Sequence, residues 1–569
     1  MKGIVAGLLA ILVAGLIAHA PPTEAGFNWD DDSYLTRNTL VGRDDGLVDI
    51  WLKPQASPQY YPLVFTGFWI EGRLWGLNPL GFRWTNVLMH LAAALLLWQL
   101  IRQCGWRGGW IAGLLFAVHP MTVESVAWIT ERKNVQALLL MLLALLAQAR
   151  SAGLTAAAPR RHDAPLALLL FVAALLSKTM ASCAVVFAWL MMIQAGHHNP
   201  LVAARRLWPW ALAALTLGLH TAWLEVAHVG AHGNHWELDP GQHLVLAARI
   251  VWHYLATFAW PVDLCFSSPR WDLALLGGRA WGLVMALVCT LAALWSQRTM
   301  RALALATLAA LFPALGFFNV YPMRFSWVAD HFAHFALVPL CLGTALALTS
   351  LKRWGRIMPA LAALALAAPL ALMAREHGKS FANIETLWTT TLERHPRSFL
   401  AVHNLGVLRL NAGLQAPEGK ERTRLLNTAG TLLEQARDLV PTDPLSLTNL
   451  ARLEQARGNR PGAWALLAKA RLLDPGHPQL HFVTARLEES ANNWPAALAA
   501  YKACLARSPH HLQARRRLAN AHWRLGDADR AEQILSDLLQ ERPAPWHAQG
   551  NPVWDQATQN LRELRQLRP

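Results

Sequence analysis

Three adjacent carboxylates, Asp30, Asp31 and Asp32, follow the first apolar segment of the chain. Crowded carboxylates raise one another's pKa or bind a cation, so one of them can act as a general base toward a hydroxyl group. A capped, solvated turn before a short helix explains the same residues. The residue types alone leave both interpretations open.

A second polar cluster, residues 119–134, lies between two apolar runs. Its polar members include His119, Glu124, Glu131, Arg132, Lys133 and Asn134. Charged groups at membrane depth are costly unless they pair or serve a function. The charges of this cluster could simply pair with one another. The sharper hypothesis is an electropositive pocket in which Arg132 and Lys133 hold a phosphate.

A third cluster, with Arg324, Asp330, His331 and His334, comes just before another apolar run. Asp330 and His331 could be an interfacial pair, and Arg324 could bind lipid headgroups. Two histidines beside one aspartate are compatible with a metal, but no other ligand spacing supports one. We therefore predict no metal site here, and a divalent metal elsewhere has no support.

The elements that hold these clusters are membrane helices. The 569 residues are 54% hydrophobic and 15% charged, which is too apolar for a soluble chain of this size. Charge density roughly doubles after residue 375. We predict a polytopic membrane domain over 1–375 and a soluble domain over 376–569. The net charge of +15 lies partly in short clusters between apolar runs, which indicates membrane topology rather than nucleic-acid binding.

About eleven runs are long and apolar enough to be read as membrane crossings. They fall near 3–20, 83–101, 108–122, 134–149, 164–179, 181–195, 207–226, 277–296, 302–318, 332–350 and 356–374. Lysine and arginine clusters between alternate runs place the loop 21–82 and the domain 376–569 on the outer face. The first run could instead be a signal peptide, and His243–Trp260 is read as an interfacial or re-entrant helix.

The soluble domain has an internal repeat. Pro441, Pro475, Pro509 and Pro543 are spaced by 34 residues, the period of the tetratricopeptide helix-turn-helix unit. The earliest unit keeps this period only if about ten residues near 412–422 are an insertion. The fold class is therefore all-α, a membrane helix bundle followed by an α-solenoid. Such arrays bind extended peptides or proteins, or they act as a packing cap.

These motifs, in this order, resemble those of the transmembrane and tetratricopeptide-repeat-containing O-mannosyltransferases and their bacterial relatives. The matching pieces are Asp30-Asp31 with Asn38, Asn86 with His90, the cluster from His119 to Asn134, Ala329-Asp330, and the repeats. The resemblance implies a C-type glycosyltransferase fold and an inverting transfer. A polyprenyl-phosphate sugar is then the substrate in place of a cofactor, and a Ser or Thr of an envelope protein is the acceptor.

The resemblance also assigns roles to particular residues. It makes Asp30 and Asp31 the catalytic pair, with the division of labour open. Arg132 and Lys133 would meet the donor phosphate, with Glu124 orienting them. Further supporting positions are His119, Asn134, His90, Asp330 and His331. The family commonly has Asp-Arg-Tyr where this chain has Asp330-His331-Phe332, and Arg324 is the candidate for the missing cation.

Two other functions fit the same sequence. One is a non-catalytic membrane scaffold that organises proteins through its repeats. The other is an enzyme that modifies polyprenyl-linked glycans or lipids. The expected location is the inner membrane, with the repeats and the active site on the periplasmic face, and mannose is taken from the family alone.

Overall fold

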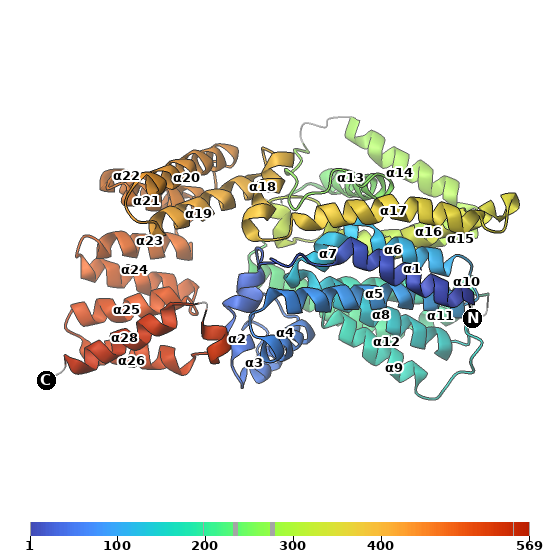
Figure 1. Cartoon of the computed structure of the whole chain (residues 1–569), viewed down its shortest axis with the longest axis horizontal. Helices are drawn as coiled ribbons and strands as arrows, with labels where there is room; N and C mark the ends of the chain where they lie inside the picture. Colours follow the sequence, from blue (N-terminus) through green and yellow to red (C-terminus); the bar gives the residue numbers. More distant parts are fainter. Residues whose placement is uncertain (1, 197–198, 232–236, 274–278, 550, 568–569) are drawn as a thin grey trace. The chain divides into compact units, whose positions relative to one another are not determined.

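The computed structural model describes residues 2–196, 199–231, 237–273, 279–549 and 551–567. Across these residues the regular elements are helices and short 3₁₀ or π turns, labelled α and η (Figure 1). The chain forms two compact units. The first contains Met1–Asn38 and Val48–Leu387, and the second contains Thr39–Leu47 and Trp388–Pro569. Residue 375, the predicted domain boundary, lies within the helix Met358–Lys379, twelve residues before the first unit ends at Leu387.

The first half of the membrane unit runs from the amino terminus to the basic loop before Trp208. Its elements are α1 Lys2–His19, η1 Asp32–Thr36, α3 Gly46–Leu52, α4 Pro62–Trp75, α5 Pro79–Gln103, α6 Gly109–Val118, η2 Pro120–Thr122, α7 Val123–Ala127, η3 Ile129–Glu131, α8 Arg132–Ser151, α9 Asp163–Leu175, η4 Thr179–Cys183, α10 Ala184–Gln194 and α11 Pro200–Arg206. Residues Gly46 and Leu47 of α3 fall in the second unit by contact.

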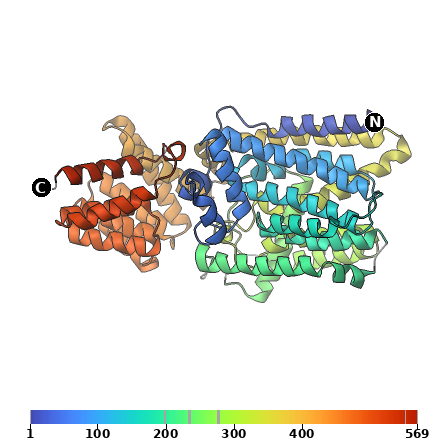
Figure 2. The same ribbon diagram turned by 90° about the horizontal axis from the view of Figure 1, so that it is seen from below.

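The second half completes the bundle. Its elements are α12 Trp208–Leu224, η5 Glu225–Val229, α13 Pro240–Ala259, α14 Arg279–Trp295, α15 Arg298–Leu311, η8 Phe312–Ala314, η9 Tyr321–Arg324, η10 Asp330–Ala333, α16 Leu337–Thr349, η11 Ser350–Trp354, α17 Met358–Lys379 and the first part of α18 Ile384–Arg394. The first helix, α1, packs against α17, α6 and α5, and the two views show it alongside α17 (Figures 1 and 2).

Each of the eleven predicted runs coincides with a helix, but not all of these helices are long. Four are long and apolar enough to cross a membrane: Pro79–Gln103, Ile129–Ser151, Trp208–Val229 and Met358–Lys379. A fifth span is possible if Gly109–Val118 and Pro120–Ala127, which meet at 62°, form one broken crossing. The chain is thus a multi-pass membrane protein, and eleven crossings remain a prediction. The segment His243–Trp260 lies on α13, which is not among the four.

Local sequence explains where these helices begin. The Asn78 side chain accepts a hydrogen bond from the N–H of Leu80 at the start of α5, directly before Pro79. Asp239 and Gln242 form a reciprocal capping box at the start of α13. The bend between α6 and α7 falls at His119-Pro120, where proline removes a main-chain donor and the His119 ring accepts from the N–H of Met121. That bend turns the polar cluster of residues 119–134 inward.

The second unit is a helical array with the predicted period. Its helices are α2 Thr39–Gly42, α19 Phe399–Gln415, α20 Lys420–Leu439, α21 Pro444–Ala456, α22 Arg460–Leu473, α23 Pro478–Glu489, α24 Trp494–Arg507, α25 Leu512–Arg524, α26 Ala528–Gln540, α27 Pro545–Ala548 and α28 Val553–Gln566. Each of the four repeat prolines follows the end of a second helix. The extra residues near 412–422 lengthen α19 and α20, which have 17 and 20 residues against 12 to 14 in the later pairs.

Candidate active site

The carboxylates of the first outer loop stand on a pinned turn. Trp29, just before them, has a φ of 26°, in the left-handed region that costs energy for a residue with a side chain. Two contacts hold the turn: the N–H of Asn28 donates to Asp31 Oδ2 at 2.7 Å, and the Asn28 amide donates to the carbonyl of Phe381 at 2.9 Å. The loop is thereby fixed to the chain segment after α17.

Asp31 is an anchor. Its side chain is fully buried, and Oδ1 accepts two hydrogen bonds from Thr130, one from the N–H at 2.9 Å and one from the hydroxyl at 2.6 Å. Burial raises the pKa of Asp31 to about 6, while the bonds from Thr130 and Asn28 act in the opposite direction. With both oxygens engaged, Asp31 joins the first loop to the cluster of residues 119–134.

Asp30 has a different environment. It is half-buried, and across the described residues its carboxylate forms neither a hydrogen bond nor an ion pair. Burial raises the pKa of Asp30 to about 7; the positive charge of Lys133 opposes this shift, and the charge of Asp32 adds to it. The Asp32 carboxylate forms an ion pair with Arg37, in which Oδ2 lies 3.2 Å from Nη1. Asp30 is therefore the carboxylate of the three that is placed to exchange a proton near neutral pH.

Glu131 organises the cations beside Asp30. Its Oε1 lies 2.9 Å from Lys133 Nζ, and its Oε2 lies 3.0 Å from Lys178 Nζ. The amide of Asn134 donates to the same Oε2 at 2.6 Å. Taken by themselves, the two ammonium groups and Glu131 carry one net positive charge, and the nearby carboxylates of Asp30, Glu124 and Glu225 also interact with the two lysines. The ammonium groups are the part of this cluster suited to an anionic ligand.

Lys133, a predicted phosphate ligand, lies between two aromatic rings. Its ammonium lies 5.0 Å from the centre of the Tyr34 ring and 5.9 Å from that of Trp128. Its side chain retains 9% exposure. Tyr34 belongs to η1, immediately after the three aspartates, so the loop of Asp30 and the start of α8 share this aromatic contact.

Arg132, the other predicted phosphate ligand, is bound by protein groups in this structure. The side chain is fully buried, Nε donates to Asn86 Oδ1 at 2.7 Å, and Nη2 donates to the carbonyl of Phe82 at 2.7 Å. Its Nη1 forms an ion pair with Glu71. All three nitrogens are thus occupied by protein groups, because the first residue of α8 points toward α4 and α5. The role of Arg132 as a donor-phosphate ligand stays a prediction, and it would require at least one of these contacts to be exchanged for the phosphate.

Glu124, predicted to orient Arg132 and Lys133, contacts His331 in this structure. Its Oε2 accepts from the N–H of His331 at 3.0 Å, and its Oε1 lies 2.9 Å from His331 Nδ1. Glu124 therefore orients His331 instead of the two cations, because α7 faces η10. The other ring nitrogen of His331 lies 3.9 Å from Glu131 Oε1. His331 thus stands between two carboxylates.

The remaining predicted residues hold the scaffold together. The Asn134 amide bridges Ser125, Glu131 and the carbonyl of His331. The ring of His119 stacks on Phe258 and contacts its carbonyl at 3.1 Å.

Other predicted positions lie around this core. His90 contacts the carbonyl of Ala117 at 3.3 Å. Asp330 is buried, 4.0 Å from the His377 ring, and Arg324 lies on η9 over the ring of Phe325. We found no ligand-like group of three or more His, Cys, Asp or Glu side chains in the described residues.

Three contributors to this region were missed from the sequence: Lys178, Glu71 and Glu225. Lys178 is the one charged residue of the predicted run 164–179, near its end, so the argument used for residues 119–134 would also have selected it. Glu225 accepts from Gln59, whose own side-chain oxygen accepts from the Tyr34 hydroxyl at 2.5 Å. Glu71 lies on a helix without an obvious polar motif, and its pairing with Arg132 depends on the folded structure.

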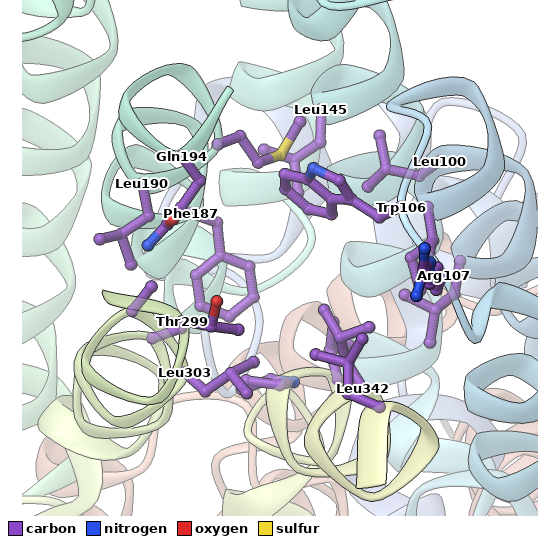
Figure 3. A pocket seen from close by; sticks show the side chains of 18 of the residues that line it. Leu100, Trp106, Arg107, Leu145, Phe187, Leu190, Gln194, Thr299, Leu303 and Leu342 are labelled. Carbon is purple, nitrogen blue, oxygen red and sulfur yellow. The ribbon is translucent and has the colours of Figure 1, made fainter. Parts of the chain in front are cut away.

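A mainly apolar cavity lies elsewhere in the bundle, near the ends of α5 and α10 (Figure 3). It measures about 410 Å³ and is lined mostly by apolar side chains, with Trp106, Arg107 and Gln194 among the polar ones. Leu145 on its wall is about 18 Å along α8 from Lys133, at 1.5 Å per residue. With no carboxylate on its lining, it offers no general base.

Comparisons with known proteins match segments of this chain. Residues 490–549 match the tetratricopeptide repeat family. The chain is 29% identical over 187 residues to protein O-mannosyl-transferase Tmtc3 of Drosophila melanogaster, covering 27% of this chain and 20% of that protein. It is 39% identical over 143 residues to protein O-mannosyl-transferase TMTC2 of Mus musculus, covering 23% and 17%.

The matched segments thus span about a fifth of the length of these relatives. Among solved structures, the chain is similar to a thermophilic tetratricopeptide-repeat protein of Thermus thermophilus. That likeness has 23% identity and a TM-score of 0.23, and it covers 31% of this chain and 95% of the other.

Proposed function

We propose that this protein is a membrane glycosyltransferase that moves a sugar from a polyprenyl-phosphate donor to a Ser or Thr hydroxyl of a protein. The observation that carries the proposal is that Asp30, a half-buried carboxylate without a hydrogen-bond partner in the described residues, lies within the electrostatic influence of the Lys133 ammonium, whose charge lowers the pKa of Asp30 against the effect of burial. The named activity of the relatives, protein O-mannosyl transfer, supports this reaction class.

In the proposed reaction, Asp30 is the general base. The acceptor oxygen attacks the anomeric carbon, its proton passes to the Asp30 carboxylate, and the bond from that carbon to the phosphate oxygen breaks. Attack from the side opposite the leaving group inverts the anomeric centre. A carboxylate with a pKa of about 7 is well matched to this step at neutral pH.

Lys133 and Lys178 stabilise the leaving group. As the glycosidic bond breaks, negative charge accumulates on the departing polyprenyl phosphate, and fixed positive charge lowers the energy of that state. Glu131 holds both ammonium groups at 2.9 and 3.0 Å and leaves the group with a net positive charge. Asp31, bound to Thr130, positions the loop without touching the substrate.

The repeats supply the acceptor. Arg452 and Arg486 occupy equivalent positions one period apart, on α21 and α23, and Arg517 follows on α25. Burial and the positive charge of the next arginine lower the pKa of Arg452 and of Arg486, so these cations lie close together. Glu489 pairs with Arg517 at 2.7 Å. This row of cations favours an acceptor segment with acidic residues near its Ser or Thr.

The proposed orientation places the carboxylates and the repeats on the outer face, which is the periplasmic face of an inner membrane. The basic loops between alternate apolar runs support this orientation. On that face soluble nucleotide sugars are not at hand, so a lipid-linked donor suits the reaction. Mannose is the sugar suggested by the relatives' names.

The test is a transfer assay with the purified full chain in lipid nanodiscs. The donor is a short-chain polyprenyl phosphate mannose, the acceptors are Ser/Thr peptides, and the product is read by mass spectrometry. We expect hexose addition with the wild type, a loss of at least about a hundredfold with Asp30→Asn, and full activity with the matched Asp32→Asn variant. Envelope glycopeptides from cells carrying the same variants should change in parallel.

Equal glycopeptide profiles for wild type, deletion and Asp30→Asn would overturn the proposal and favour a membrane scaffold that acts through its repeats. Glycolipids that change while protein profiles stay constant would favour an enzyme that modifies polyprenyl-linked glycans.

A further inference from the structure

A second cationic site lies away from the group around Glu131. A cavity of about 150 Å³ opens between the ends of α1 and α17, the start of α5, and α7. Three cations line it: Arg83, Arg375 and Lys379. The rest of its wall is mainly small or apolar and includes Ala18, Pro21, Val87, Val123, Val126 and Ala127.

Arg83 is the unusual member. The side chain is 1% exposed, and its Nη2 donates to the carbonyls of Gly26 and Phe381 at 2.6 Å. Its Nε and Nη1 have no hydrogen-bond partner in the described part of the chain. A buried guanidinium with two unused nitrogens is costly, and an anion in the adjoining cavity would add to the stabilisation of its charge by Asp31.

The other two cations complete a ring around the opening. Arg375 Nη1 donates to the carbonyl of Ile17 at 3.2 Å, which fixes it at the end of α1. Lys379 pairs with Glu376 at 2.5 Å, and both of these side chains are exposed. Glu376 is not part of the cavity wall, so the wall itself carries three positive charges.

The position suggests the level of lipid headgroups. Met358–Lys379 and Pro79–Gln103 are both long enough to cross a membrane. Lys379 ends the first of these helices, and Arg83 lies in the first turns of the second. Basic pockets between membrane helices at this depth bind phosphate groups of lipids. The volume accommodates one phosphate rather than a whole sugar headgroup.

We propose that the cavity bounded by Arg83, Arg375 and Lys379 binds a phosphate-bearing anion, separate from the donor phosphate at Lys133. The shared chemistry is a phosphate group, which either an anionic phospholipid or free phosphate provides. The bound anion ties α1 and α17 to the segment Gly26–Asp31 through Arg83. This inference stands on the cavity and holds whether or not the chain transfers a sugar.

The experiment is native mass spectrometry of the full chain, released from nanodiscs with equal amounts of phosphatidylglycerol and phosphatidylcholine, and a parallel titration with inorganic phosphate. The test variant is Arg375→Gln/Lys379→Gln. Both native side chains are exposed, so replacing them should leave folding intact. The matched control is Lys352→Gln/Arg356→Gln, two exposed cations that are not on the cavity wall.

We expect retained phosphatidylglycerol on the wild type, about tenfold less on the test variant, and no change on the control. Retention of the lipid alone identifies a headgroup as the ligand, and binding of inorganic phosphate identifies a free anion. The proposal is overturned if the wild type binds neither anion, or if the control loses as much as the test variant.

Discussion

The hydroxyl and the N–H of Thr130 both donate to Oδ1 of Asp31, at 2.6 and 2.9 Å. This pair connects the loop before η1 to the start of α8, and so it places Asp30 and Lys133 in one region. The division of labour between the two adjacent aspartates follows: Asp31 holds the loop, and Asp30 is free to act on a substrate.

We predict that Asp31→Asn destabilises the protein by about 2 kcal/mol, because the buried acceptor loses its charge and its bonds to Thr130 and Asn28 weaken. Asp30→Asn should leave the free energy of unfolding nearly unchanged below about pH 4, where the Asp30 carboxyl is protonated in the folded and the unfolded state. Unfolding in nanodiscs, followed by tryptophan fluorescence, measures both. A stable Asp31→Asn variant with lost activity would contradict the anchoring role.

The rate should depend on the ionisation of Asp30. Its pKa is raised from 3.8 to about 7, so kcat should rise through pH 7 and fall by about tenfold per unit below pH 6. The raised pKa means that the folded state holds this proton more tightly than the unfolded state. Its contribution to stability is therefore present at low pH and is lost as the pH rises from about 4 to 7.

Asp30→Asn should remove this loss, so above pH 7 the variant should be more stable than the wild type. A pH–rate profile of the wild type and melting curves of both proteins at pH 5 and 8 test the two statements. A flat rate between pH 5 and 8 would exclude Asp30 as the base.

The two lysines on Glu131 should act on the leaving group. Lys133→Gln is expected to lower kcat by about a hundredfold, and Lys133→Arg to restore part of it, because charge at this position matters in the transition state. Lys178→Gln should have a smaller effect, since it lies on the other oxygen of Glu131. Steady-state rates with donors of different phosphate leaving-group pKa provide the measurement. Equal sensitivity to the leaving group in wild type and Lys133→Gln would contradict the role.

The ion pair between Arg132 and Glu71 should be structural. Glu71→Gln leaves the buried guanidinium without its charged partner, which costs about 3–5 kcal/mol. The double variant Glu71→Leu/Arg132→Met should recover much of this loss. Chemical unfolding of the single and the double variant checks the prediction. The control is Lys53→Gln, which breaks the i,i+4 ion pair between Asp49 and the exposed Lys53 and should cost little.

The row of arginines in the repeats should select acidic acceptors. Arg452→Glu/Arg486→Glu is predicted to weaken binding of an acidic Ser/Thr peptide by about tenfold or more, and to have little effect on a neutral one. Arg530→Glu, on the exposed start of α26, is the matched control. Fluorescence anisotropy with the two labelled peptides measures the difference. Equal loss for both peptides would indicate damage to the fold.

Periodicity predicted most of the architecture, because apolar runs and a 34-residue spacing are properties of short segments. The helices and repeats follow directly from them. The site was only partly predictable. Asp30 and Lys133 were found because charges stand out beside apolar runs, but Arg132 is adjacent to Lys133 and has the same charge. The packing of α8 against α4 shows that the charge of Arg132 forms an ion pair with Glu71, and the sequence alone did not indicate this partner.

Pairings between distant segments had no local signal. Lys178 and Glu131 are 47 residues apart, and His331 and Glu124 are 207 apart. Each of these contacts depends on how the helices assemble. The sequence does indicate that such isolated charges need partners, and it leaves the choice of partner to the fold.

The left-handed backbone of Trp29 makes the loop of Asp30 dependent on remote contacts. A conformation that costs energy persists only while Asn28 and Asp31 stay bound, so Thr130→Val, which removes the hydroxyl donor, or Asn28→Ala, which removes the amide donor, would release the loop that carries Asp30. A mutational screen that measures only sugar transfer would then classify Thr130 as a catalytic residue, although its hydroxyl binds Asp31 and not a substrate. Hydrogen exchange along residues 26–36 distinguishes a positioning residue from a catalytic one. A variant that releases the loop exchanges these amides faster, whereas a variant that only removes the base leaves their protection unchanged.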